Sequence, residues 1–103
     1  MGAILSVIDD DFQKIKNYGY IEDKFLTTIT KIADDNSCIC LSYILGFENT
    51  VFNSAQMEDI IAELKKIYPF FNDDKTIKIL DNIKAAIDFA LKDPPLYLLF
   101  EGD

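Results

Sequence analysis

Residues 38–52 read CICLSYILGFENTVF, an eight-residue apolar run, a turn and a second short run. Both alternating sets of positions in residues 38–45 are apolar or nearly so, which is typical of a strand covered on both faces. Gly46 and Asn49 tolerate a positive φ, so the chain can reverse there and return residues 50–52 as an antiparallel partner. The stretch therefore predicts a β-hairpin at the centre of the fold.

The pattern of the N-terminal residues is compatible with either a helix or a strand. Ser6-Val7-Ile8-Asp9 has the Ser-x-x-Asp form of a helix start, and apolar residues follow at helical spacing until Gly19. This pattern predicts a short amphipathic helix over residues 7–18. Residues 3–8 could instead form a strand, because six residues of mixed apolar type do not discriminate between the two, and both alternatives stay open.

Three further helices are predicted from apolar residues that recur at helical spacing. The first covers residues 21–33. The second is capped by Asn53 or Ser54, with Gln56 placed to complete a capping box with Asn53, and it closes before Pro69.

The last helix follows a capping signal in the loop after that proline and ends at Asp93, before two prolines. Residues 96–100 are then an apolar run of strand length, followed by a polar terminus. A hairpin plus a last strand makes a small antiparallel or mixed sheet covered by helices. We expect one α+β domain over residues 1–103, with about four helices packed on a small, mostly antiparallel sheet.

Charge limits the classes of partner. The chain has 18 acidic residues against 10 basic ones, all lysine, and its net charge is −8. Such a charge repels phosphate backbones and anionic membranes and attracts basic partners, although it can also serve solubility alone. We expect a protein partner, no direct nucleic-acid binding and no membrane. No stretch has membrane-spanning length or the form of a secretory signal, which predicts a cytoplasmic protein with reduced thiols.

Residues that could carry chemistry are few. The chain has no histidine, so the usual activation of a serine or cysteine nucleophile is unavailable, and only a serine–lysine arrangement stays open. Its four glycines are isolated and form no phosphate-binding loop. Cys38 and Cys40 are predicted as small core residues, because a closed thiolate site needs four soft ligands. We expect no enzymatic activity, no metal and no cofactor.

Clustered aspartates are the candidate contacts for a protein partner. Capping and the helix dipole favour aspartate at helix starts and in loops, which is the structural explanation, but exposed pairs can also bind lysine and arginine. Tyrosines beside acids are anchors of the kind that interfaces use, unless they only close the ends of the core. The candidate partner-binding residues are Asp9, Asp10, Asp11, Tyr18, Tyr20, Asp34, Asp35, Asp73 and Asp74.

The chain closes on a strand that reads Leu96-Tyr97-Leu98-Leu99-Phe100-Glu101-Gly102-Asp103. In size, charge, element order and this ending it resembles the small bacterial immunity proteins, particularly those paired with toxins of contact-dependent growth inhibition systems. The resemblance implies an antidote that binds a toxin domain, often a basic nuclease, and blocks its active site or substrate groove. The alternatives are an acidic adaptor subunit and, third, a nucleic-acid mimic, which needs carboxylates spaced like phosphates over one continuous face.

Overall fold

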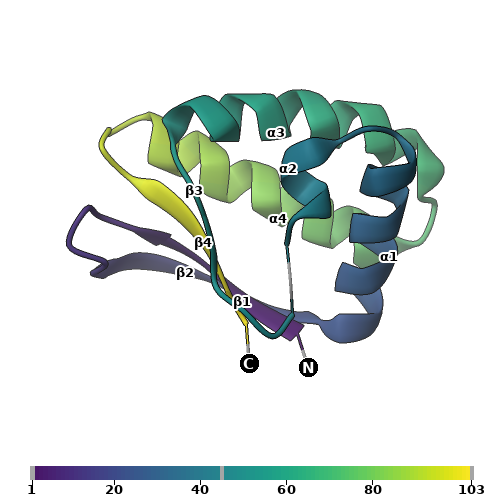
Figure 1. Ribbon diagram of the computed structural model, residues 1–103, viewed down its shortest axis with the longest axis horizontal. Coiled ribbons are helices and arrows are strands. Elements are labelled where there is room, and N and C mark those ends of the chain that lie inside the picture. Colours follow the sequence, from purple (N-terminus) through teal and green to yellow (C-terminus); the bar gives the residue numbers. More distant parts are fainter. Residues whose placement is uncertain (1, 45, 103) are drawn as a thin grey trace.

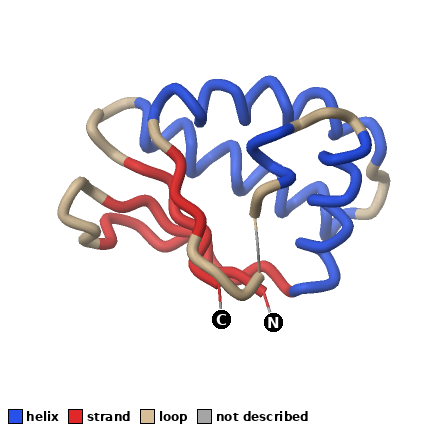
Figure 2. Tube along the Cα trace, viewed as in Figure 1, coloured by secondary structure: helices blue, strands red, loops and turns tan. Residues whose placement is uncertain are grey.

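The computed structural model describes residues 2–44 and 46–102. In chain order its elements are β1 (Gly2–Ile8), β2 (Lys14–Glu22), α1 (Asp23–Asp35), α2 (Ile39–Ser42), β3 (Thr50–Phe52), α3 (Ser54–Ile67), the 3₁₀ helix η1 (Tyr68–Phe70), α4 (Asp74–Leu91) and β4 (Tyr97–Gly102). The strands form one antiparallel sheet in the order β2-β1-β4-β3, and the helices lie against one of its faces (Figures 1 and 2). The predicted α+β class, with four helices on a mostly antiparallel sheet, is confirmed.

The longer helices and the C-terminal strand match their predictions to within two residues at each end. The capping box of α3 is formed as expected: the Asn53 side chain accepts the Gln56 backbone N–H, and the Gln56 side chain accepts the Asn53 N–H, both at 2.9 Å. Apolar stripes of these helices bury the inner face of the sheet, where the rings of Phe52 and Phe100 meet edge to face. Apolar spacing and capping residues were therefore sufficient to predict the longer helices and the C-terminal strand.

The helix predicted over residues 7–18 is wrong, and the strand alternative at residues 3–8 is the one that forms. β1 is the strand, and β2 returns beside it to make an N-terminal hairpin. β1 also pairs with β4 on its other edge and is buried along nearly its whole length. A strand inside the sheet satisfies its backbone on both edges and buries both faces, and this outweighs the helical spacing of a few apolar residues.

The central hairpin predicted over residues 38–52 is also wrong. α2 is a short helix where the first strand was expected, and Leu45 lies outside the described residues. β3 does form at its predicted place, but it pairs with β4 and not with the preceding run. The sheet therefore contains a hairpin, but that hairpin is the N-terminal one.

Burial around α2 follows helical spacing. Cys38, Leu41 and Ile44 are buried at intervals of three residues, whereas Ile39 and Tyr43 are 62% and 65% exposed. A two-sided buried strand would have hidden all five. A continuous apolar run has no polar residues at regular intervals, so the sequence cannot distinguish helical from strand periodicity here.

A carboxylate of α3 holds α2 in place. Glu63 Oε2 accepts the backbone N–H of Cys40 at 3.1 Å, and Oε1 accepts that of Leu41 at 2.9 Å. These N–H groups of a first turn have no partner within the helix, and the positive helix end favours a carboxylate. Glu63 lies 22 and 23 residues away from its two donors, so nothing local in the sequence predicts the cap.

Both cysteines are free thiols. Cys38 is buried, as predicted for a core residue, and Cys40 is half-buried, although both belong to the α2 region and not to a strand. Burial, and after it the nearby carboxylate of Glu63, raises the pKa of both thiols above its ordinary value. They therefore stay protonated at neutral pH, which makes them weak nucleophiles.

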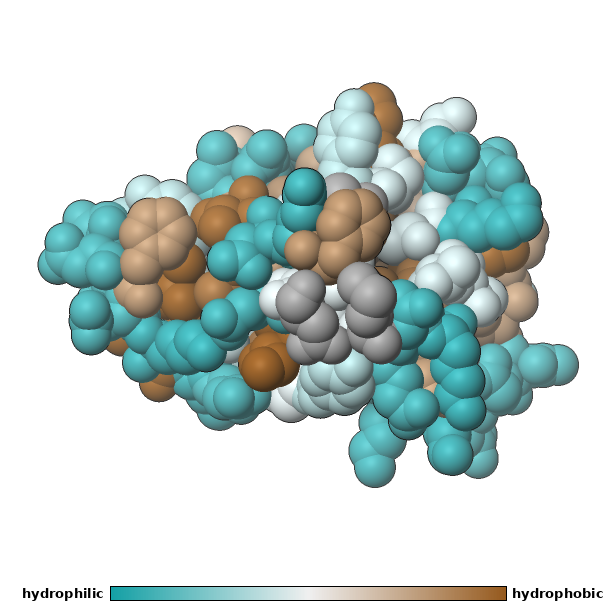
Figure 3. Space-filling model, turned by 60° about the horizontal axis from the view of Figure 1, so that its bottom comes forward, coloured by the Kyte–Doolittle hydropathy of each residue, from teal (hydrophilic) through white to brown (hydrophobic). Residues whose placement is uncertain are grey.

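The described helices leave the outer face of the sheet uncovered (Figures 1 and 2). Lys14 of β2 and Glu101 of β4 form an ion pair of 2.7 Å, which must cross the intervening strand β1 on this face. Figure 3 turns the lower side of Figure 1 forward and shows apolar side chains gathered toward the hairpin end, within a border of hydrophilic ones. This end of the outer face is where a binding surface can form.

Candidate partner-binding surface

The predicted partner-binding residues lie in four separate places. They are Asp9, Asp10 and Asp11 in the β1–β2 turn, Tyr18 and Tyr20 on β2, Asp34 and Asp35 at the end of α1, and Asp73 and Asp74 at the start of α4. The β1–β2 turn lies at one end of the 35 Å long axis, and α1 and the start of α4 lie toward the other (Figure 1). The acidic clusters therefore do not form one continuous surface.

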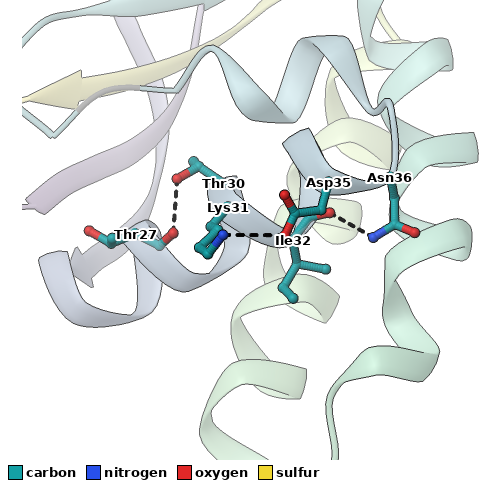
Figure 4. A network of polar contacts seen from close by, with 6 residues as sticks. All are labelled: Thr27, Thr30, Lys31, Ile32, Asp35 and Asn36. Carbon is teal, nitrogen blue, oxygen red and sulfur yellow. Dashed lines mark hydrogen bonds and ion pairs between the residues drawn. The ribbon is translucent and has the colours of Figure 1, made fainter.

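The cluster at the end of α1 is partly neutralised by its own helix. Lys31 forms an ion pair with Asp35 one turn further on, with 3.4 Å between Nζ and Oδ2. Asn36 donates from its side chain to the Ile32 carbonyl and so caps the same turn (Figure 4). Asp34 is exposed, but half of the charge of this cluster is already paired.

The cluster at the start of α4 caps the helix. Asp73 Oδ2 accepts the backbone N–H of Thr76 at 2.9 Å and its hydroxyl at 2.6 Å. These hydrogen bonds, the hydroxyl first, lower the pKa of Asp73. Asp74 stands in the first turn, where the helix dipole favours a negative charge. The structural explanation accounts for this pair.

Tyr18 and Tyr20 line a groove of about 530 Å³ between β2 and α4. The ring of Tyr18 contacts Phe89 of α4 at 6.5 Å between centroids, and the ammonium group of Lys16 lies 5.1 Å from the Tyr18 centroid. The Tyr18 ring therefore packs against other residues of the same chain. No aspartate of the three predicted clusters lines this groove, so the expected pairing of tyrosines with clustered acids does not occur here.

The edge of β2 beside this groove is hydrogen-bonded at its centre by asparagine side chains. Asn82 of α4 donates to the Tyr18 carbonyl, and the Asn17 side chain accepts the Gly19 N–H at 2.6 Å. Both contacts lie where the register between β1 and β2 shifts, opposite Leu5 and Ser6.

The β1–β2 turn combines acidic and apolar side chains. A pocket of about 260 Å³, which we call the tip pocket, opens on the outer face beside this turn. It is lined by Ile8, Asp9, Asp10, Phe12, Val51 and Tyr97. Three pairings bring these residues together: β1 with β2 through the turn, β1 with β4, and β4 with β3.

The carboxylate of Asp9 organises the turn. Its Oδ1 accepts the backbone N–H of Asp11 at 3.0 Å and that of Gln13 at 2.9 Å. Phe12 then adopts a φ of 61°, in the left-handed region, and its side chain is 69% exposed. An aspartate that binds nearby backbone N–H groups is typical of a turn, which is why three aspartates in a row end β1 here.

The negative charge of this turn is not balanced locally. One carboxylate oxygen from each of Asp9, Asp10 and Asp11 lies within 4.8 Å of the others. Lys14 stands opposite Ile8 in the strand register, but its ammonium group is directed to Glu101. Among the described residues, no lysine forms an ion pair with the three aspartates. The turn is therefore a concentrated negative charge beside an exposed aromatic ring.

Sequence reasoning named the three aspartates but missed the apolar part of the tip pocket. Helical spacing predicts Phe12 within the helix over residues 7–18, and Val51 and Tyr97 fall in the predicted strands, so no pattern in the sequence brings the three together. The aspartate triplet is the signal that could have revealed this pocket. It lies between the apolar residues 2–8 and the partly alternating KIKNYGYIE of β2, as a turn between two strands would.

Comparisons with protein-family models, with curated proteins and with solved structures find no match for this chain. Within the described part of the chain, no helix combines the length and the apolar character needed to cross a bilayer. The surface chemistry of the hairpin end is therefore the basis for a functional proposal.

Proposed function

We propose that this protein is a cytoplasmic immunity protein that binds a basic toxin domain, such as a nuclease, and blocks its active site or substrate groove. It acts by binding alone, without catalysis, metal or cofactor. The support is a net charge of −8 together with a turn where unbalanced carboxylates adjoin an exposed aromatic side chain. The resemblance of the chain to contact-dependent growth inhibition immunity proteins points to the same class.

The observation that carries the proposal is the position of Phe12 beside the aspartate triplet. The Phe12 side chain is 69% exposed, so a partner that covers it removes much apolar surface from water, which favours binding. Aromatic residues dominate the binding energy of many interfaces, and charges around them select the partner. A basic surface meets both conditions, because it complements the carboxylates and can place apolar stems over the ring.

Charge and burial act on different steps of binding. Opposite charge steers association and raises the on-rate, which salt then lowers by screening. Charge-assisted hydrogen bonds that lose their water, each worth roughly 1.5–3 kcal/mol, slow dissociation. We therefore expect tight binding whose on-rate falls as salt is raised.

The separation of the acidic clusters speaks against nucleic-acid mimicry. A mimic needs carboxylates along one continuous face, whereas these clusters lie toward opposite ends of the molecule and two of them are engaged by their own helices. An acidic adaptor subunit is the competing function. It would bind a partner through the same chemistry without inhibiting it.

The test uses the product of the gene directly upstream, where the toxin of an immunity protein is expected. The toxin domain of this product is purified, and binding is measured by calorimetry, inhibition by a nuclease assay, and protection by growth on co-expression. We expect a 1:1 complex, loss of toxin activity and rescued growth. Binding without inhibition would identify an adaptor, and the absence of both binding and protection would reject the proposal.

A further inference from the structure

The tip pocket has the size of a site for one side chain. Its volume of about 260 Å³ lies below the range of roughly 300–1,000 Å³ that is typical of sites for drug-sized ligands. It opens on the outer face of the sheet, at the end of the molecule where the proposed partner binds. Its occupant is therefore a single protruding group of that partner.

The walls of the pocket divide into three kinds of surface. Ile8 and Val51 are aliphatic, Phe12 and Tyr97 are aromatic, and Asp9 with Asp10 supplies carboxylates. A long cationic side chain has matching parts, because its methylene stem covers apolar surface, its charge is attracted to aromatic faces, and its N–H groups bind carboxylates.

The carboxylates at the pocket are available to a ligand. Asp9 Oδ1 is engaged by two backbone N–H groups, but among the described residues its Oδ2 accepts no hydrogen bond, and the Asp10 carboxylate accepts none at all. Lys14, the lysine nearest in register, is held by Glu101 at 2.7 Å. No group described within the chain supplies the positive charge that these carboxylates lack.

We propose that the tip pocket binds one arginine side chain of the partner. This inference rests on the proposed function for the identity of the partner, but the chemistry of the pocket stands by itself. Arginine fits better than lysine, because its planar guanidinium stacks on an aromatic ring, binds carboxylates through two N–H groups and is more weakly hydrated. A divalent cation fits less well, since it needs six or more oxygen ligands and here meets aliphatic and aromatic walls.

The test is an NMR titration of the intact ¹⁵N-labelled protein at low ionic strength. The probes are N-acetyl-arginine amide, N-acetyl-lysine amide and the neutral N-acetyl-norleucine amide. We expect saturable shifts of the amides of residues 8–12, 51 and 97 with the arginine probe, weaker by about threefold in affinity with lysine, and none with norleucine.

Two variants and two matched controls separate pocket binding from general effects. Asp10→Asn removes charge while keeping shape, and Phe12→Ala removes the exposed ring. Both should reduce arginine affinity at least about threefold. Asp59→Asn and Phe70→Ala make the same changes at exposed positions that do not line the tip pocket and should leave it unchanged. A dispersed spectrum in each variant confirms that it is folded.

Several results would overturn the inference. They are the absence of saturable shifts with arginine, equal shifts with norleucine or lysine, unchanged binding in both pocket variants, and a Ca²⁺ titration that shifts the same amides at lower concentration than arginine does. Because the titration contains no toxin, its failure would leave the toxin experiment standing. A toxin that fails to bind would likewise leave a positive titration intact.

Discussion

The aspartate clusters at the start of α4 and in the β1–β2 turn are similar in sequence but differ in their hydrogen-bond partners. At the start of α4, Asp73 is engaged by the backbone and hydroxyl of Thr76, and its cluster completes a helix. In the β1–β2 turn, Asp9 also accepts backbone N–H groups, but Asp10 and Asp11 remain exposed beside Phe12 without an ion pair among the described residues. The number of acids in a cluster is thus less informative than the donors that surround it.

The largest expected effect is on partner binding, and it distinguishes the β1–β2 turn from the region around η1. Phe12→Ala should weaken binding to the toxin domain more than about tenfold, because truncating an aromatic hot spot of an interface costs about 2 kcal/mol or more. Phe70→Ala, which truncates a ring that is 57% exposed in η1, should change it less than about threefold. Calorimetry of both variants measures the difference, and equal losses would place the interface elsewhere.

A second prediction tests Glu63, whose carboxylate caps the start of α2. Glu63→Ala should destabilise the protein by about 1–3 kcal/mol, because the backbone N–H groups of Cys40 and Leu41 lose a charged acceptor in a partly buried site. Glu58→Ala changes an exposed residue of the same helix and should cost less than about 0.5 kcal/mol. Urea unfolding gives both values, and a cost for Glu63→Ala no larger than the control would show that α2 does not depend on this cap.

The pH dependence of stability isolates the helix-capping aspartate. Hydrogen bonds from Thr76 lower the pKa of Asp73 in the folded protein, so its stabilising contribution is complete above the ordinary value of about 3.9 and is lost as the pH falls through the lower folded value. Asp73→Asn still caps the helix but cannot titrate. Thermal unfolding between pH 5 and 2 should therefore show a smaller loss of Tm in this variant than in the wild type, and parallel curves would contradict the assignment.

The smallest expected effect concerns the unbalanced turn. Asp10→Asn should raise Tm slightly, by about 1–2 °C at low salt, because it relieves repulsion within the aspartate triplet. Added salt should shrink this gain by screening. Differential scanning calorimetry at two salt concentrations is sufficient, and a clear loss of Tm would mean that Asp10 has a structural partner that the contacts described above do not include.

Local signals were enough for about half of the fold. α1, α3, α4 and β4 follow from amphipathic spacing, and the capping box of Asn53 and Gln56 marks the start of α3. These features depend on residues a few positions apart, where propensity and capping act directly. The same locality made the helix-capping role of the Asp73 cluster foreseeable.

The sequence by itself thus determined the fold class, the longer helices and the three aspartate clusters as candidates, because each depends on neighbours in the chain. Tertiary structure decided the rest: β1 is a strand because β4 pairs with it, and α2 is a helix because Glu63 reaches it from α3. The tip pocket likewise exists only where three strands meet, and the charge beside it is unbalanced because Lys14 is held by Glu101, 87 residues away. Contacts at such separations leave no periodicity in the sequence, so only the folded chain reveals which acids are free to bind.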